Sequence, residues 1–121
     1  MKTRQTVPML FVADVERSMD YYKHLGFELG NTFAADGATK PTWAWLQSDD
    51  ASLMLAATNE PIIPSEQRVL FYLYTDDIKT AHAALTEAGL NPGPITTPFY
   101  APRGEFQLTD PDGYVLMLTH T

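Results

Sequence analysis

The chain contains no cysteine among its 121 residues. Disulfide scaffolds, thiol nucleophiles and cysteine-based metal sites are therefore excluded. Long apolar segments are lacking as well, because runs such as 9–13 fall far short of the roughly 20 residues that span a membrane. The first residues do not resemble the apolar core of a signal peptide. We therefore expect a cytoplasmic protein that does not act in a membrane.

Basic residues are also scarce. Eight lysines and arginines stand against fifteen aspartates and glutamates, which gives a net charge of −7. Nucleic-acid binding requires a basic surface, so a nucleic-acid partner is not expected. The negative charge suits a cationic or neutral small ligand. The alternative is that the charge only keeps the protein soluble.

What the chain does have is the length of one domain and an ordinary apolar fraction of 45%. A chain of this size buries roughly two-thirds of its unfolded surface. We therefore expect one folded domain over 1–121.

An internal repeat divides that domain. A shift of 63 positions aligns residues 7–15 with 70–78, and the same shift aligns 53–55 with 116–118. Chance similarity between two strand–helix segments is the alternative, but a match at both ends of the unit favours a true repeat. The repeat predicts two modules, at about 5–60 and 68–121.

Each module has the pattern of a strand, a helix and three further strands. Asp14 and Asp77 are suited to cap helices, while Gly26 and Gly89 are suited to end them. The two prolines in 60–67 indicate a linker. The expected strands lie near 8–12, 27–33, 42–47 and 51–57, then near 70–74, 93–97, 104–109 and 114–119.

Alternation along the strands predicts two kinds of face. One face carries leucine and phenylalanine and should be covered by a helix. The other face mixes apolar, aromatic and polar side chains, which is typical of a binding-cavity wall. It carries Met9, Met54, Tyr72, Glu105 and Met117.

Two motifs give the chain a family resemblance. Residues 12–27, which start Val-Ala-Asp-Val, and the Asp-Pro-Asp-Gly-Tyr turn at 110–114 resemble the vicinal oxygen chelate superfamily. That group includes glyoxalase I, extradiol dioxygenases, fosfomycin-resistance enzymes and bleomycin-binding proteins. The resemblance implies an α+β fold in which tandem βαβββ modules form a curved mixed sheet around a central cavity.

The enzymes of that superfamily hold a divalent metal with His, Glu or Gln in the first and last strands of each module. The matching positions here are Val7, Met54, Leu70 and Met117. Aliphatic side chains carry no lone pair, and a thioether is a soft donor unsuited to zinc, manganese or iron(II). We therefore expect neither a metal nor any other cofactor.

The three histidines do not supply an alternative ligand set. His24 is expected in solvent near the end of the first helix, His82 at a helix–sheet margin, and His120 at the end of the chain. Their spacing is not that of a zinc site. No nucleophile triad or phosphate-binding loop is present either, so no catalytic residue is predicted.

The expected ligand-binding residues provide stacking, soft packing and charge. Aromatic rings and methionines suit flat, cationic ligands. Trp43 and Trp45 could instead be core, the methionines could be gap-fillers, and Arg103 could simply pair with Glu105. The full set is Phe11, Trp43, Trp45, Met54, Tyr72, Tyr100, Arg103, Glu105 and Met117.

These features favour a metal-free protein that binds or sequesters a small, drug-like molecule, as the resemblance to bleomycin-resistance proteins implies. The same resemblance implies a homodimer and a role in antibiotic resistance. Phe99 and Tyr100, on a proline-rich segment, suit either a lid or an interface. The alternatives are a glyoxalase- or dioxygenase-like metalloenzyme with a displaced metal site, and a non-catalytic regulatory or interaction module.

Overall fold

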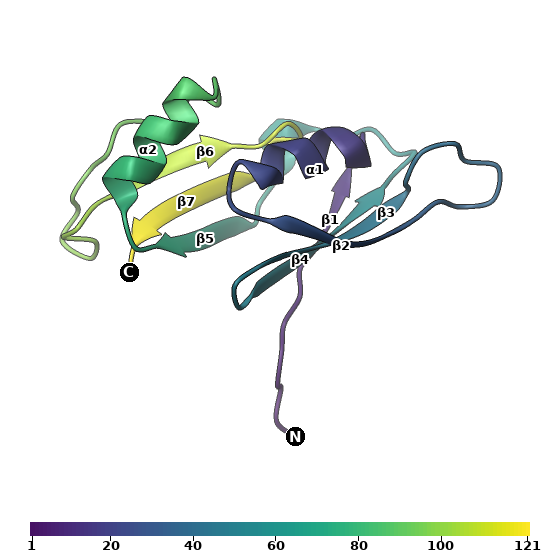
Figure 1. Ribbon diagram of the computed structural model, residues 1–121, viewed down its shortest axis with the longest axis horizontal. Coiled ribbons are helices and arrows are strands. Elements are labelled where there is room, and N and C mark those ends of the chain that lie inside the picture. The colour runs from purple at the N-terminus through teal and green to yellow at the C-terminus, as the bar shows by residue number, and fades with distance from the viewer. The chain divides into compact units, whose positions relative to one another are not determined.

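The computed structural model describes all 121 residues, which form two compact units, Met1–Ile62 and Ile63–Thr121. Each unit contains one helix packed on one face of a mixed sheet (Figure 1). The fold class expected from the sequence is confirmed, with seven strands rather than eight. No helix is long and apolar enough to cross a bilayer.

Unit 1 contains β1 (Met9–Val12), α1 (Val15–Lys23), β2 (Glu28–Phe33), β3 (Trp43–Ser48) and β4 (Ala51–Ala57). The strands lie in the order β1-β4-β3-β2, and β1 is parallel to β4. Unit 2 contains a short 3-10 helix (Pro64–Glu66), β5 (Leu70–Thr75), α2 (Ile78–Glu87), β6 (Glu105–Thr109) and β7 (Val115–His120). Its strands lie in the order β5-β7-β6, and β5 is parallel to β7.

The repeat offset recurs in the strand registers. Met9 pairs with Met54 across β1 and β4, and Tyr72 pairs with Met117 across β5 and β7. Both pairs are related by the 63-residue shift. The sequence alignment therefore identified structurally equivalent positions.

Both helices begin and end in the same way. The carboxylates of Asp14 and Asp77 accept hydrogen bonds from the backbone N–H groups of Arg17 and Thr80, at 3.1 and 3.0 Å. At the other end, the N–H of Phe27 donates to the carbonyl of Tyr22, and the N–H of Leu90 to that of Leu85.

The intervening Gly26 and Gly89 have φ of 89° and 81°. A residue with positive φ, followed by a residue whose N–H donates to the carbonyl five positions earlier, defines the Schellman motif. The predicted caps and breakers are confirmed.

The helix-facing sides of the sheets are the core. Leu53, Leu55, Leu116 and Leu118 are buried there, as the alternation predicts. Phe71 and Leu73 are only half-buried, because β5 lies at a sheet edge and α2 packs mainly against the neighbouring β7.

The strand predicted at 93–97 is wrong. The structure has only an isolated bridge there, between Thr96 and Glu105. Pro92, Pro94 and Pro98 surround the bridge, and proline has no N–H to donate to a ladder. The second sheet therefore has three strands, and residues 93–96 follow β6 through only a few backbone hydrogen bonds.

The predicted linker at 60–67 is also not wholly irregular. Pro64–Glu66 form one turn of 3-10 helix, with proline at its start. Pro64 lies against Gly113 in the β6–β7 turn. The 3-10 helix is therefore packed within unit 2.

Candidate functional site

Each unit has its own candidate site, the sheet face that its helix leaves open. In unit 1 this face lies opposite α1, and most of the side chains on it are large and apolar. We call it open face 1. It comprises Met9, Phe11, Asn31, Phe33, Trp43, Trp45, Met54 and Ala56, which the strand registers place in two rows.

The first row of open face 1 runs from Met9 through Met54 and Trp45 to Asn31 across all four strands. The second row runs from Phe11 through Ala56 and Trp43 to Phe33. Met9, Phe11 and Phe33 are 44%, 51% and 61% exposed. Large apolar side chains gathered on one accessible surface typically mark a binding site.

Trp43 and Trp45 lie on open face 1 and are half-buried, whereas the alternating Ala44 and Leu46 form the core beneath. The interpretation of these tryptophans as core residues is therefore wrong. Gly30 provides room for one of the two rings. A Cβ at Gly30 would lie 2.9 Å from Cδ1 of Trp45, so a side chain there would displace the indole.

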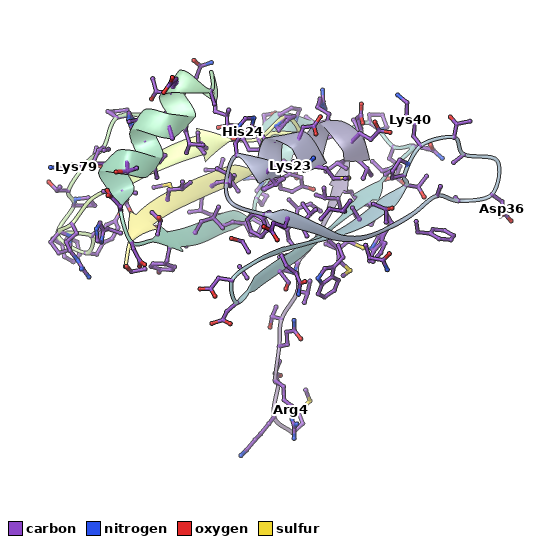
Figure 2. The ribbon with its side chains drawn as sticks, in the orientation of Figure 1. Arg4, Lys23, His24, Asp36, Lys40 and Lys79 are labelled. Carbon is purple, nitrogen blue, oxygen red and sulfur yellow. The ribbon has the colours of Figure 1, made fainter.

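A loop, residues 34–42, connects the edge strand β2 to its neighbour β3. Its tip bears Asp36, and Lys40 lies on the returning side (Figure 2). Thr42 closes the base of the loop, because its Oγ1 accepts a hydrogen bond from the N–H of Ala35 at 3.0 Å. The loop thus holds charged groups beyond the aromatic rows of the sheet.

Open face 2 is the corresponding surface of unit 2, opposite α2. It comprises Leu70, Tyr72 and Tyr74 on β5, Val115, Met117 and Thr119 on β7, and Glu105, Gln107 and Thr109 on β6. The rings of Tyr72 and Tyr74 stack with centroids 6.4 Å apart and an interplanar angle of 30°. Both tyrosines are exposed, so this face offers flat aromatic surface next to polar groups.

Glu105 is the most unusual residue of open face 2. It is only 3% exposed, although it is a carboxylic acid. The phenol of Tyr100 donates a hydrogen bond of 2.9 Å to its Oε1. Arg103 is exposed and does not supply the hydrogen bond to Glu105. The proposed Arg103–Glu105 pair is therefore absent, and the partner is a neutral tyrosine.

The contact changes the acidity of the phenol. The hydrogen bond to Glu105, followed by burial and the negative charge of that residue, raises the pKa of Tyr100 above its ordinary value of 10.0. Tyr72 adds a smaller electrostatic contribution to the same shift. Phe99 packs edge-on against Tyr100 at 5.4 Å.

The structure thus divides the nine predicted site residues between the two units. Unit 1 brings together Phe11, Trp43, Trp45 and Met54. Unit 2 brings together Tyr72, Tyr100, Glu105 and Met117, while Arg103 stays exposed to one side. Sequence reasoning missed Phe33 as a site residue, because the β2 bulge between Leu29 and Asn31 obscured its position. Alternation along the strand expected at 114–119 puts Thr119 on the same face as Met117, although it was not among the nine predicted ligand-binding residues.

The three histidines lie at a helix end, at a helix–sheet margin and near the end of the chain. His24 is the exposed C-terminal cap of α1. The Nε2 of His82 lies 2.8 Å from the carbonyl oxygen of Gly93, and its ring packs edge-on against Phe106 at the helix–sheet margin. The Nδ1 of His120 lies 3.0 Å from the carbonyl oxygen of Thr121.

The superfamily metal does not fit the residues at its expected positions. Met54 and Met117 lie on the open faces, Leu70 begins β5, and Val7 precedes β1. None is a ligand for a hard divalent ion. The structure also holds no cluster of three or more histidine, aspartate or glutamate side chains that could bind one.

Comparison with known families agrees with this architecture. The family model described as Glyoxalase/Bleomycin resistance protein/Dioxygenase superfamily matches residues 4–118. The chain belongs to this superfamily. Among curated proteins, none matches it in sequence.

Solved structures of the superfamily share the fold at low identity. A bleomycin resistance determinant encoded on the transposon Tn5 matches with a TM-score of 0.79 and 22% identity, over 98% of each chain. A bleomycin-binding protein complexed with bleomycin matches with a TM-score of 0.76 and 23% identity, over 98% of this chain and 99% of the other. The fosfomycin resistance protein FosX from Mesorhizobium loti matches with a TM-score of 0.75 and 13% identity, over 98% and 92%.

Proposed function

We propose that this protein binds and sequesters a flat, aromatic, drug-sized molecule without making or breaking a bond. The observation that carries the proposal is open face 1, where Trp43, Trp45 and Phe11 lie beside two methionines on a surface that no helix of unit 1 covers. Flat ligands stack on such rings. The similar proteins named for bleomycin binding and resistance support an antibiotic as the ligand.

Charge supports the choice of a cationic ligand. The chain has a net charge of −7, which attracts cations over distances of about 8–10 Å at ordinary ionic strength. A cation above an aromatic face gains roughly 0.5–2 kcal/mol. Methionine side chains adapt to ligands of different shape. Affinity would therefore come from stacking and charge, and shape would be only loosely specified.

Isothermal titration calorimetry tests the proposal. Bleomycin and the aromatic cation ethidium are the two probes, and we expect saturable heat with at least one. Trp45→Ala should weaken binding at least tenfold, because it removes a central ring from open face 1. Tyr21→Ala, which removes a half-buried ring from α1, is the matched control and should leave affinity unchanged.

Absence of saturable binding by both probes would refute sequestration. Metal analysis separates the enzyme alternative: stoichiometric zinc, iron, manganese or nickel in the purified protein, bound through residues of the open faces, would favour a metalloenzyme.

We further propose that the protein acts as a homodimer. Phe99 is 96% exposed and Phe33 is 61% exposed, and such large apolar side chains are commonly covered by a second chain. Light scattering after size-exclusion chromatography should give twice the mass of one chain. A single-chain mass at micromolar concentration would contradict the dimer.

A further inference from the structure

Two buried oxygen atoms on open face 2 have no hydrogen-bond partner. They are Oε2 of Glu105 and Oγ1 of Thr119. Glu105 is 3% exposed and Thr119 is 8% exposed. Buried polar atoms are nearly always paired, because an unpaired one forfeits its hydration without compensation. Two such atoms in one small sheet require a physical explanation.

The two residues are direct neighbours. Glu105 on β6 pairs with Thr119 on β7 in the antiparallel register, so their side chains emerge on the same face with Cβ atoms about 4.5–5.5 Å apart. Tyr74 pairs with Thr119 on the other side. The two unpaired oxygens therefore belong to one row, which ends in an exposed aromatic ring.

The Glu105 carboxylate has no positive partner. Its other oxygen, Oε1, accepts a hydrogen bond only from the neutral Tyr100 phenol, and Arg103 remains exposed. Burying a charged carboxylate without a cation is costly. Tyr100 itself is 59% exposed and lies on the segment between the Thr96 bridge and β6, so it can rotate away from Glu105.

We propose that Glu105 and Thr119 bind a protonated primary amine of the ligand, an inference that rests on the proposed function and specifies its ligand class. An ammonium group has three N–H donors. The site has three matching acceptors: both carboxylate oxygens of Glu105 and the hydroxyl oxygen of Thr119. The amine displaces the Tyr100 phenol from Oε1, and the aromatic part of this ligand lies toward Tyr72 and Tyr74 on open face 2, so the contact involves unit 2 alone and not the tryptophans of open face 1.

The size and chemistry of the site favour an amine over other cations. An ammonium is a compact charge, whereas a guanidinium is a wide planar fork that needs acceptors in its own plane. A divalent metal ion needs six or more oxygen ligands for calcium or near-ideal octahedral ligands for magnesium. Two adjacent side chains with three oxygens match the three N–H donors of an ammonium group and offer too few ligands for either metal ion.

The test compares two probes that differ only in the head group. 2-Naphthylmethylamine carries the ammonium, and 2-naphthylmethanol presents the same ring system with a neutral hydroxyl. Binding is followed by two-dimensional amide NMR of the intact chain. We expect the amine to bind at least tenfold more tightly and to shift the amide signals of Glu105 and Thr119.

Two variants distinguish a binding role from a structural one. Glu105→Gln should lower amine affinity about 10- to 100-fold, the value of a hydrogen bond to a charged group, and abolish the preference over the alcohol. Thr119→Val should lower amine affinity but raise the melting temperature of the free protein, because it removes an unpaired buried hydroxyl. A purely structural hydroxyl would show the opposite effect on melting. Glu87→Gln on α2 makes the same charge change on an exposed residue and should alter neither property.

Several outcomes would overturn the amine site. Equal affinity of wild type for the two probes, or amide signals of Glu105 and Thr119 that do not move, would refute it while leaving aromatic binding intact. If bleomycin binds but neither probe does, the amine site is again wrong and the proposed function stands. If none of the three binds, both fall. Because wild type alone supplies the probe comparison, a variant that fails to fold does not prevent a decision.

Discussion

At the scale of single residues, Tyr100 reports on the buried carboxylate beside it. Its hydrogen bond to Glu105, more than burial or charge, raises the pKa of the phenol above 10.0. A pKa raised in the folded state stabilises the protein below the unfolded value, near pH 10. That contribution is lost as the pH rises through the higher folded value.

We predict that Glu105→Leu lowers the pKa of Tyr100 toward its ordinary value, because it removes the hydrogen-bond acceptor that is the largest cause of the shift, together with the negative charge. The pH dependence of the tyrosine Cζ chemical shift measures this, and Tyr100→Phe assigns the signal. Glu87→Gln is the charge-matched control. An unchanged pKa in Glu105→Leu would mean that Glu105 is not the cause of the shift.

At the scale of elements, the turn at 110–114 fixes the start of the last strand, β7. Asp110 Oδ1 accepts hydrogen bonds from the N–H groups of Asp112 and Tyr114, both at 2.9 Å. Gly113 has φ of 90°, and a Cβ there would lie 2.5 Å from Cα and Cβ of Pro64. The turn therefore needs glycine for its conformation and for its contact with the 3-10 helix.

Gly113→Ala should destabilise the protein by more than the roughly 1–3 kcal/mol that a strained backbone conformation costs. Gly37→Ala is the matched control, because Gly37 also has a positive φ, 81°, but no atom within 4 Å of the added Cβ. Urea unfolding measures the loss in unfolding free energy for each variant. The difference between the two losses gives the cost of the steric contact with Pro64. Equal losses in the two would show that the Pro64 contact contributes nothing.

The Asp77 cap of α2 should make the stability of the protein depend on pH in acid. Hydrogen bonds from the backbone and side chain of Thr80 lower the pKa of Asp77 below 3.8. A lowered folded pKa means that the cap stabilises the protein above pH 3.8 and that this is lost as the pH falls through the lower value.

Asp77→Asn retains an acceptor for the cap but cannot titrate. We expect its stability to change less than that of wild type between pH 5 and pH 2, measured by urea unfolding followed by circular dichroism. Asp36→Asn, which changes an exposed loop carboxylate, is the control. If wild type and Asp77→Asn lose stability in parallel, the Asp77 cap does not contribute to the acid response.

At the scale of the whole molecule, net charge governs the encounter with a ligand. A charge of −7 attracts a cation over a distance set by ionic strength, about 30 Å at 0.01 M salt and 8 Å at 0.15 M. Affinity depends mainly on contacts at short range, whereas the association rate depends on this long-range attraction.

We predict that the association rate of ethidium falls several-fold when salt is raised from 0.01 to 0.15 M, while that of 2-naphthylmethanol does not change. Stopped-flow fluorescence measures both rates. The neutral probe controls for salt effects on the fold. The same salt dependence for both probes would exclude electrostatic steering.

Much of the fold was predictable because its signals are local. Asp14 and Gly26 mark the ends of α1, and the alternation of Leu53 and Leu55 with Met54 marks the two faces of β4. Each depends on residues within a few positions. The strand at 93–97 was predicted wrongly because backbone pairing there depends on donors that the surrounding prolines lack.

The candidate site was predictable only in part. The sequence indicated Trp45, Tyr72 and Glu105, but it could not decide whether the tryptophans were core or surface. The structure answers this, since β3 presents Trp45 on the side that α1 does not cover. The alternative in which Arg103 pairs with Glu105 is wrong, because proximity along the chain says little about side-chain direction, and Tyr100 makes the contact instead.

The sequence by itself determined the repeat, the helix limits and the core-facing residues of β4 and β7, since these follow from residue type and spacing. That apolar residues occupy the positions of the superfamily's metal ligands followed from the family resemblance. Only the tertiary structure decided that Phe33 joins Trp43 in one row, that Tyr100 contacts Glu105, and that Glu105 and Thr119 are adjacent with unpaired oxygens. These depend on the register between strands and on the path of a loop, which arise from packing distant segments together.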